Sequence, residues 1–131
     1  MPALLAVVLL AVSPCKIVGA ADASATLGGP VGKPKAQTLG LYQSCTYSHG
    51  TATLTVQTRA VSRADFVKSA KANPPPVKPV SGIGAGAIAY SAAGFTLLVW
   101  RNGTEATFTV VGAGNGLAAE KTLAKRVAAR I

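Results

Sequence analysis

Few residues in this chain have the chemistry to act as nucleophiles, bases or metal ligands. It has one histidine, two cysteines and four acidic residues among 131. Cys45 and His49 lie in a stretch that we expect to be a strand and a turn, and an extended chain would hold them about 13 Å apart. A nucleophile and its base need hydrogen-bond reach, and a zinc site needs three or four ligands. We therefore predict no catalytic and no metal-ligating residue, and interpret His49 as a surface turn residue.

The four acidic residues do not form an evident acid–base pair. Asp22 and Asp65 lie where helices are expected to begin, where a carboxylate favours the helix dipole. Glu105 is beside a predicted hairpin. Glu120 falls on the apolar side of its predicted helix, with Arg101 as a conceivable partner. Catalysis by two carboxylates needs a defined pairing that this sequence does not show, so we expect no enzyme.

The glycine-rich stretch 110–119 lies between a predicted strand and a predicted helix, the setting of a dinucleotide-binding turn. Its spacing is Gly-x-Gly-x-Gly, one residue short of the fingerprint, and only one helix follows it. No acidic residue is placed to hold a ribose. A second glycine cluster, 82–86, precedes a strand instead of a helix. We expect no cofactor.

These residues must be positioned by a meander that spans 80–112. Asn102-Gly103 is typical of a two-residue type I′ turn, because both residues accept positive φ. The strand before it, 95–101, carries apolar residues on both faces and is expected to be central. The strand after it, 104–111, has threonines on one face and is expected to be half-solvated. Residues 87–90 form the first strand.

The rest of the chain predicts a hairpin and flanking helices. Strands 41–48 and 51–58 meet at His49-Gly50. Loops are expected at 31–41 and, as a stiff proline connector, at 74–79. Helices are expected at 20–27, 62–72 and 117–131. The fold class is therefore α+β, with a mostly antiparallel sheet of about five strands (a hairpin plus a three-stranded meander) packed by two or three helices.

The N-terminus carries an unbroken apolar run, 3–12. A membrane-spanning helix needs about 20 such residues, so we expect no transmembrane anchor. The run has the length of a signal-peptide core, although no Lys or Arg precedes it. Cleavage after Ser13 or after Ala21 fits the small-residue pattern, and Pro14 before Cys15 argues against lipidation. We divide the chain into a signal-like segment, 1–14, and one domain, 15–131.

Two cysteines fit one disulfide in an exported protein. Cys15 paired with Cys45 would close a loop worth roughly 3–4 kcal/mol. In the alternative, cleavage after Ala21 removes Cys15 and leaves Cys45 as a buried thiol.

The chain is strongly basic, with a formal net charge of +9. Lys121, Lys125, Arg126 and Arg130 on the last helix are candidate anion-binding residues. They equally fit a solvated face, since basic residues are favoured near a helix C-terminus. Specific nucleic-acid binding is not expected, because no aromatic residues are interleaved with the basic ones.

Several short stretches together resemble a known family: Cys15 to Val18, Asp22-Ala23, Leu27 to Val31, Cys45 to Tyr47, then Val80 to Gly84 and Ala89-Tyr90. The chain resembles the small exported domains of actinobacterial secreted proteins and lipoproteins, a group of unknown function with a Mog1/PsbP-like fold. This resemblance implies a secreted, periplasmic or cell-envelope location, without a catalytic residue.

We accordingly expect an exported, non-catalytic envelope module with a binding or accessory role. Its partner would be an envelope protein, a lipid or a cell-wall component. The alternative is a basic protein that binds polyanions or anionic surfaces. The sequence does not indicate an oligomeric state.

Overall fold

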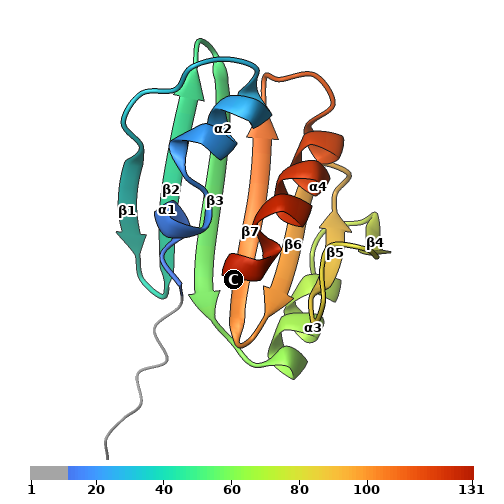
Figure 1. Cartoon of the computed structure of the whole chain (residues 1–131). Coiled ribbons are helices and arrows are strands. Elements are labelled where there is room, and N and C mark those ends of the chain that lie inside the picture. The colour runs from blue at the N-terminus through green and yellow to red at the C-terminus, as the bar shows by residue number, and fades with distance from the viewer. Residues whose placement is uncertain (1–11) are drawn as a thin grey trace, which may run out of the picture.

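The computed structural model describes residues 12–131, so most of the apolar run 3–12 and its signal-like interpretation lie outside the described residues. The described chain forms one seven-stranded sheet in which every neighbouring pair is antiparallel. Figure 1 shows the chain order: α1 (Pro14–Ile17), α2 (Ala20–Leu27), β1 (Lys35–Leu39), β2 (Tyr42–His49), β3 (Ala52–Ala60), α3 (Arg63–Lys71), β4 (Val77–Val80), β5 (Ile88–Ala92), β6 (Thr96–Arg101), β7 (Thr104–Val111), α4 (Gly116–Val127) and a 3₁₀ turn, Ala128–Arg130.

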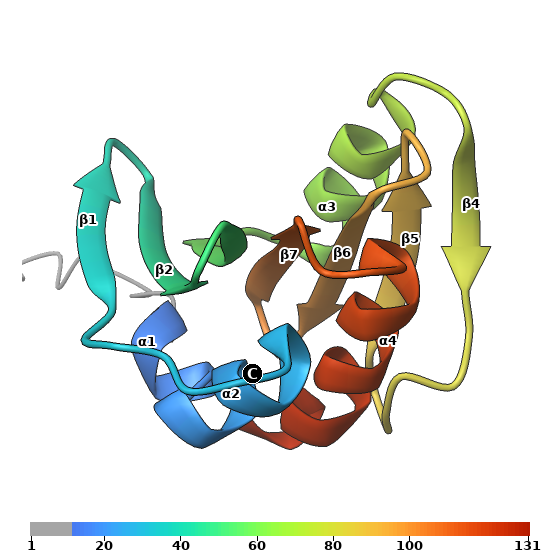
Figure 2. The same cartoon turned by 90° about the horizontal axis from the view of Figure 1, so that it is seen from above.

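The strand order is β1-β2-β3-β7-β6-β5-β4. Helices α1, α2 and α4 lie on one side of the sheet, which we call the front face, and α3 lies on the other side, the back face (Figure 2). On the back face α3 packs at the β6 side of the sheet, and no helix of residues 12–131 covers the β1 side. The helices thus cover most of the front face but not the exposed edge strand β1, and on the back face they cover the β6 side.

The prediction of about five strands and two or three helices was wrong, because the described chain has seven strands and four helices. The unexpected helix is the short α1, and the two missed strands are the two edges of the sheet. The segment that contains β1 was expected to be a loop, and β4 was expected to be a proline connector. All five β1 residues are exposed, so the strand lacks the buried alternate positions that reveal strands in a sequence. In β4 the proline Pro79 is tolerated because an edge strand needs ladder bonds on one side only. The α+β composition and the antiparallel pairing stand.

The front core explains the apolar periodicity of α4. Leu123, Ala124 and Val127 are buried, and α4 contacts β7 and β6. Asn115 caps the helix, since its side-chain oxygen accepts a hydrogen bond from the Ala118 N–H at 3.2 Å. At the other end, the Arg101 guanidinium donates to the carbonyl oxygen of Ile131 at 3.0 Å. A cation there favours the helix dipole.

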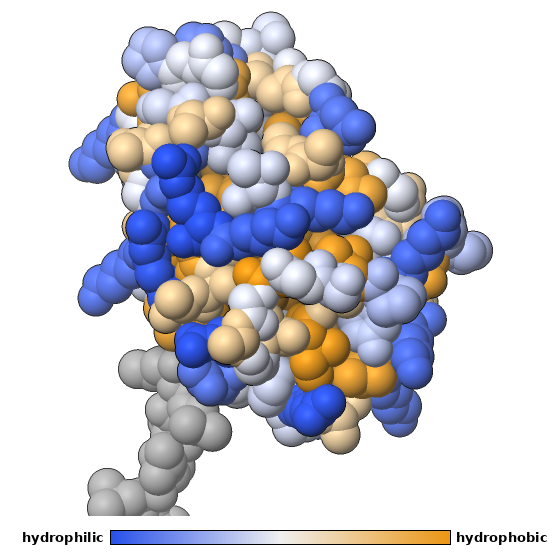
Figure 3. Space-filling view, turned by 45° about the vertical axis from the view of Figure 1, so that its right-hand side comes forward, coloured by the Kyte–Doolittle hydropathy of each residue, from blue (hydrophilic) through white to orange (hydrophobic). Residues whose placement is uncertain are grey.

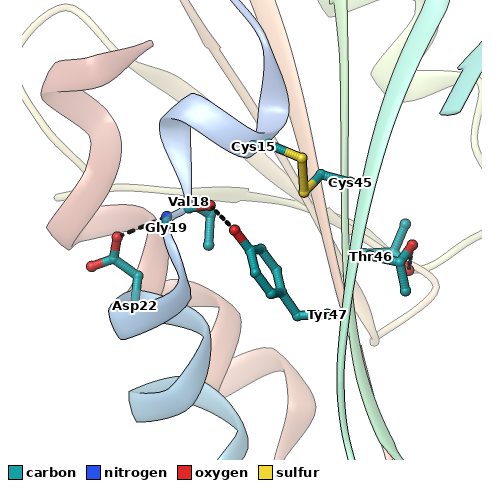
Figure 4. Close-up of a disulfide and its surroundings, with 8 residues drawn as sticks. Cys15, Val18, Gly19, Asp22, Cys45, Thr46 and Tyr47 are labelled. Atoms are coloured by element: carbon teal, nitrogen blue, oxygen red, sulfur yellow. Dashed lines mark hydrogen bonds between the residues drawn. A yellow bond between two sulfur atoms is a disulfide. The ribbon is translucent and has the colours of Figure 1, made fainter. Parts of the chain in front are cut away.

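The predicted disulfide, Cys15–Cys45, is present, with 5.4 Å between the two Cα atoms. It joins α1 to β2, and two residues further along β2 the hydroxyl of Tyr47 donates to the Val18 carbonyl at 2.8 Å (Figure 4). Both contacts hold the N-terminal helices against the front face. In this structure Cys45 is therefore paired, and a disulfide is typical of an oxidising compartment.

Candidate functional site: the open half of the sheet

Side chains of directly paired strand residues share a face, so the registers define rows across the back face. One row runs Gln37, Ser44, Gln57, Thr107 from β1 to β7. The next row runs Lys35, Thr46, Thr55, Thr109. A third begins with Ser48 and Thr53. We call this region of β1, β2, β3 and β7 the open half.

The centre of the open half, on β2, β3 and β7, carries no charged side chain in a chain of net charge +9, and Lys35 on the edge strand β1 is the charge in its rows. On β2, β3 and β7, three consecutive rows carry only hydroxyl and amide side chains, apart from Val111 at the upper end. Most are half-buried, as expected for residues that stand on a sheet with one free side. The residues of this polar array are Ser44, Thr46, Ser48, Thr53, Thr55, Gln57, Thr107 and Thr109.

Beyond β7 the same face changes character. Phe66 and Ala70 of α3 are buried against Leu98 of β6 and Ala92 of β5. Tyr90 lies 6.0 Å from Phe66 between ring centroids. We call this region of β4, β5 and β6 the covered half. Here the residues that face α3 are apolar, whereas no helix of the described chain covers the array.

Arg59 stands at the boundary between the halves. Its guanidinium donates to both carboxylate oxygens of Glu105, at 2.8 and 3.3 Å, and to the Ser69 hydroxyl of α3 at 3.1 Å. It also lies over the Tyr42 ring, 5.5 Å from the centroid. Because Glu105 is only 5% exposed, this pairing is what makes its charge tolerable there.

Two of the four candidate anion-binding residues form ion pairs within the protein. Arg130 donates to Asp22 at 2.7 Å and to the Ile17 carbonyl at 2.9 Å, and Arg126 lies 3.8 Å from the same carboxylate. Burial alone would raise the pKa of Asp22, but the bonds from Arg130 and from the Gly19 N–H outweigh it and lower the pKa. Of the four candidates, Arg126 therefore links α4 to α2, and Arg130 links the 3₁₀ turn after α4 to α2.

Lys121 is half-buried and Lys125 is exposed, and neither joins an ion pair within residues 12–131. Hydrophilic side chains gather on the face that carries α4, with apolar groups between them (Figure 3). The two lysines on α4 lie on the front face and are therefore separate from the array on the back face.

His49 has a structural contact at the end of β2. Its Nδ1 is 2.8 Å from the Pro30 carbonyl oxygen. The ring lies over Gly29, where an added Cβ would come within 2.3 Å of it. His49 thus holds the loop that follows α2. Within residues 12–131, no cluster of three or more His, Cys, Asp or Glu side chains could hold a metal ion.

Glu120 is the buried acid that the sequence left unexplained. Its Oε2 accepts a hydrogen bond from the Val110 N–H at 2.8 Å, and its Oε1 has no hydrogen-bond partner within the described chain. Arg101, the conceivable partner, contacts the C-terminal carbonyls instead. Burial raises the pKa of Glu120 to about 7, against the lowering effect of the hydrogen bond from the Val110 N–H. The β6–β7 pairing ends at Thr96 and Thr109, so the carboxylate of Glu120 takes the place of a strand partner for the Val110 N–H.

The glycine-rich turn before α4 is explained by backbone packing. Gly112 has a φ of 78°, and an added Cβ at Gly116 would lie 2.8 Å from the Val110 carbonyl oxygen. These glycines let the chain turn closely from β7 into α4. Among the described helices, none is long and apolar enough to cross a membrane.

Sequence reasoning missed the open half as a site. The threonines of 51–58 and 104–111 were visible as the solvated sides of two strands. What the sequence did not show was that β3 and β7, about fifty residues apart in the chain, are neighbours in register. The signal that could have found the array is the absence of charge from these alternate positions in a basic chain.

Comparisons with known proteins identify no relative. No family model, no curated protein and no solved structure matches this chain.

Proposed function

We propose that this protein is an exported, non-catalytic module of the cell envelope, and that the polar array on the open half binds a neutral glycan of the cell wall. The observation that carries the proposal is a continuous neutral array of hydroxyl and amide groups on an uncovered sheet face of a +9 chain. The disulfide supports an oxidising location, and the resemblance to exported actinobacterial domains supports the envelope.

The chemistry of the array favours a ligand rich in hydroxyl and amide groups. Threonine and serine hydroxyls and glutamine amides both donate and accept hydrogen bonds. Neighbouring strands are about 4.8 Å apart, so the array repeats on the scale of successive groups along a sugar chain. Threonine is stiff at χ1, so fixing these side chains on a ligand costs little conformational entropy.

The other partners fit the array less well. A protein partner would be expected to bury aromatic or arginine anchors, which the array lacks. A lipid would need an exposed apolar patch. A polyanion would need Lys or Arg, which lie on the front helices and on the margins of the open half.

The test is co-sedimentation with purified insoluble peptidoglycan. Wild-type protein should bind, and the bound fraction should persist at about 0.5 M salt, where charge attraction is strongly screened. The double variant Thr55→Lys/Thr107→Lys places two long charged side chains in the array. We expect it to lose at least about 10-fold in affinity, equivalent to about 1.4 kcal/mol.

The matched control is Ser81→Lys/Thr122→Lys, which adds the same charge at two exposed positions outside the array. It should bind as the wild type does. Wild-type protein that stays in the supernatant would overturn the proposal. Binding that disappears at high salt in all three proteins would favour the polyanion alternative and the basic face of α4.

A further inference from the structure

The two edges of the sheet differ in how they are protected. The β4 edge contains Pro79, which has no N–H to offer another strand, and the charged Lys78 beside it. The β1 edge has no proline within it, and Lys35 at its start is its only charge. All five β1 residues are exposed, and no described segment pairs with the outer side of the strand. An edge of this kind is a template for an added strand.

The residues that offer free backbone groups can be assigned from the hairpin. Leu39 pairs with Tyr42 across the two-residue turn Gly40-Leu41, so this closing pair is hydrogen-bonded. Bonded and non-bonded pairs alternate along an antiparallel ladder. Ala36 and Thr38 therefore direct their N–H and C=O groups away from β2.

A small cavity of about 160 Å³ lies beside this edge. Ala36 and Thr38 line it on the β1 side, and Pro14 and Cys15 line it from the α1 side. Its volume is of the order that holds a benzene-sized group. In strand addition, backbone bonds supply affinity and such pockets supply side-chain specificity.

The ends of β1 differ in chemistry. Lys35, preceded by Lys33 in the loop, makes one end cationic. At the other end Leu39 is 53% exposed and Leu41 is 86% exposed. A net charge of +9 on each chain opposes the approach of a second copy and attracts an acidic partner. The complementary strand is one with an acidic residue opposite Lys35 and an apolar residue opposite Leu39.

We propose that the outer edge of β1 is a docking site for an extended acidic segment of another protein, which adds an eighth, antiparallel strand to the sheet. Residues of that segment opposite Ala36 and Thr38 point to the front face and place small apolar side chains at the cavity. The site lies on the rim of the open half and does not depend on glycan binding.

The probe is a fluorescent synthetic peptide that contains Leu-Val-Thr-Val-Asp, written to run antiparallel to β1 with Asp opposite Lys35. Anisotropy titration with the full protein should show saturable binding. Hydrogen exchange should slow at the amides of Ala36 and Thr38 when the peptide is present. Lys35→Glu should weaken binding at least about 5-fold, and a peptide with Lys in place of Asp should recover the loss on that variant.

Thr38→Pro removes an outward N–H while leaving the β1–β2 bonds intact, so it should abolish peptide binding in a folded protein. Thr38→Ala is the matched control and should bind normally. Unchanged affinity in Thr38→Pro would overturn the proposal. So would concentration-dependent dimerisation of the protein alone that Thr38→Pro abolishes, because a second copy would then be the natural occupant of the edge.

Discussion

The back face of the sheet is apolar in the covered half and polar in the open half. Where α3 lies over it, the sheet presents Leu98, Tyr90 and Ala92, and Phe66 fills the space between helix and strands. Where no described helix lies over the back face, the strands β2, β3 and β7 present hydroxyl and amide side chains. The change occurs between β7 and β6, and the Arg59–Glu105 pair stands at the boundary.

The difference teaches that cover determines which side chains a strand tolerates. Under a helix, a polar atom without a partner costs the full penalty of its lost hydration. On the open half most hydroxyls are half-exposed and can bond to water or to one another, as Thr46 and Thr55 do at 3.3 Å, so threonine is acceptable at alternate positions. Comparable substitutions in the two kinds of surface should therefore have unequal effects on stability.

The largest expected effect is at the centre of the covered half. Phe66→Ala removes a fully buried ring between α3 and the sheet, and should lower the free energy of unfolding by about 3–5 kcal/mol. The matched open-half variant, Gln57→Ala, should change it by no more than about 0.5 kcal/mol. Chemical denaturation of both variants measures the difference. Equal losses would mean that something also covers the open half.

The second effect tests a polar group beneath the front helices. Glu120 is fully buried, and its pKa of about 7 lies above the ordinary value of 4.5. Between these pH values the Glu120 carboxyl therefore binds a proton more tightly in the folded protein than in the unfolded chain. The contribution of Glu120 to stability should be greatest below about pH 4.5 and should fall as pH rises towards 7. The loss would reach about 3 kcal/mol.

Glu120→Gln should keep an acceptor for the Val110 N–H without a titrating charge. Denaturation curves at pH 5 and pH 8 should show the variant more stable than wild type at pH 8, with most of that gain gone at pH 5. A gain of the same size at both pH values would show that the carboxyl does not titrate in this range.

The boundary pair should give an intermediate effect. Arg59→Met leaves Glu105 buried and without its partner, and should cost about 2 kcal/mol, less than a fully buried pair because the Arg59 side chain is 18% exposed. Arg59→Met/Glu105→Gln removes the stranded charge and should recover about half of that loss. A double-mutant cycle measures the coupling. Additive losses in the cycle would show that the two side chains act independently.

The sequence was informative where local pattern and burial agree. Asn102 and Gly103 have φ of 51° and 84°, as the predicted turn requires. Ser62 accepts a hydrogen bond from the Asp65 N–H at 3.2 Å and caps α3, where the sequence predicted that a helix begins. Strand β6 is an interior strand contacted by α4 and α3, as its apolar residues on both faces predicted, although the middle of the seven strands is β7.

It was uninformative where the deciding contact comes from a distant segment. The strand β1 forms because β2 offers it a ladder, since nothing in its own alternation marks it. The role of Glu120 depends on where β6 ends, because the Val110 N–H then lacks a partner on β6 and donates to the Glu120 carboxylate of α4 instead. The polar array exists only through the pairing of β3 with β7. None of these follows from periodicity within one element.

The smallest expected effects come from the substitution of threonine by valine, made once on the covered front face and once in the open half. Thr58 is fully buried on the front face of β3, and its Oγ1 has no hydrogen-bond partner within the described residues. Valine has nearly the same shape, so Thr58→Val removes an unsatisfied hydroxyl without leaving a cavity and should stabilise the protein by about 1 kcal/mol. Thr109→Val in the open half replaces a hydrated hydroxyl and should stay within about 0.5 kcal/mol of wild type. Urea denaturation resolves the sign of the difference, and a loss of stability at Thr58 together with a gain at Thr109 would reverse the assignment of covered and open surfaces.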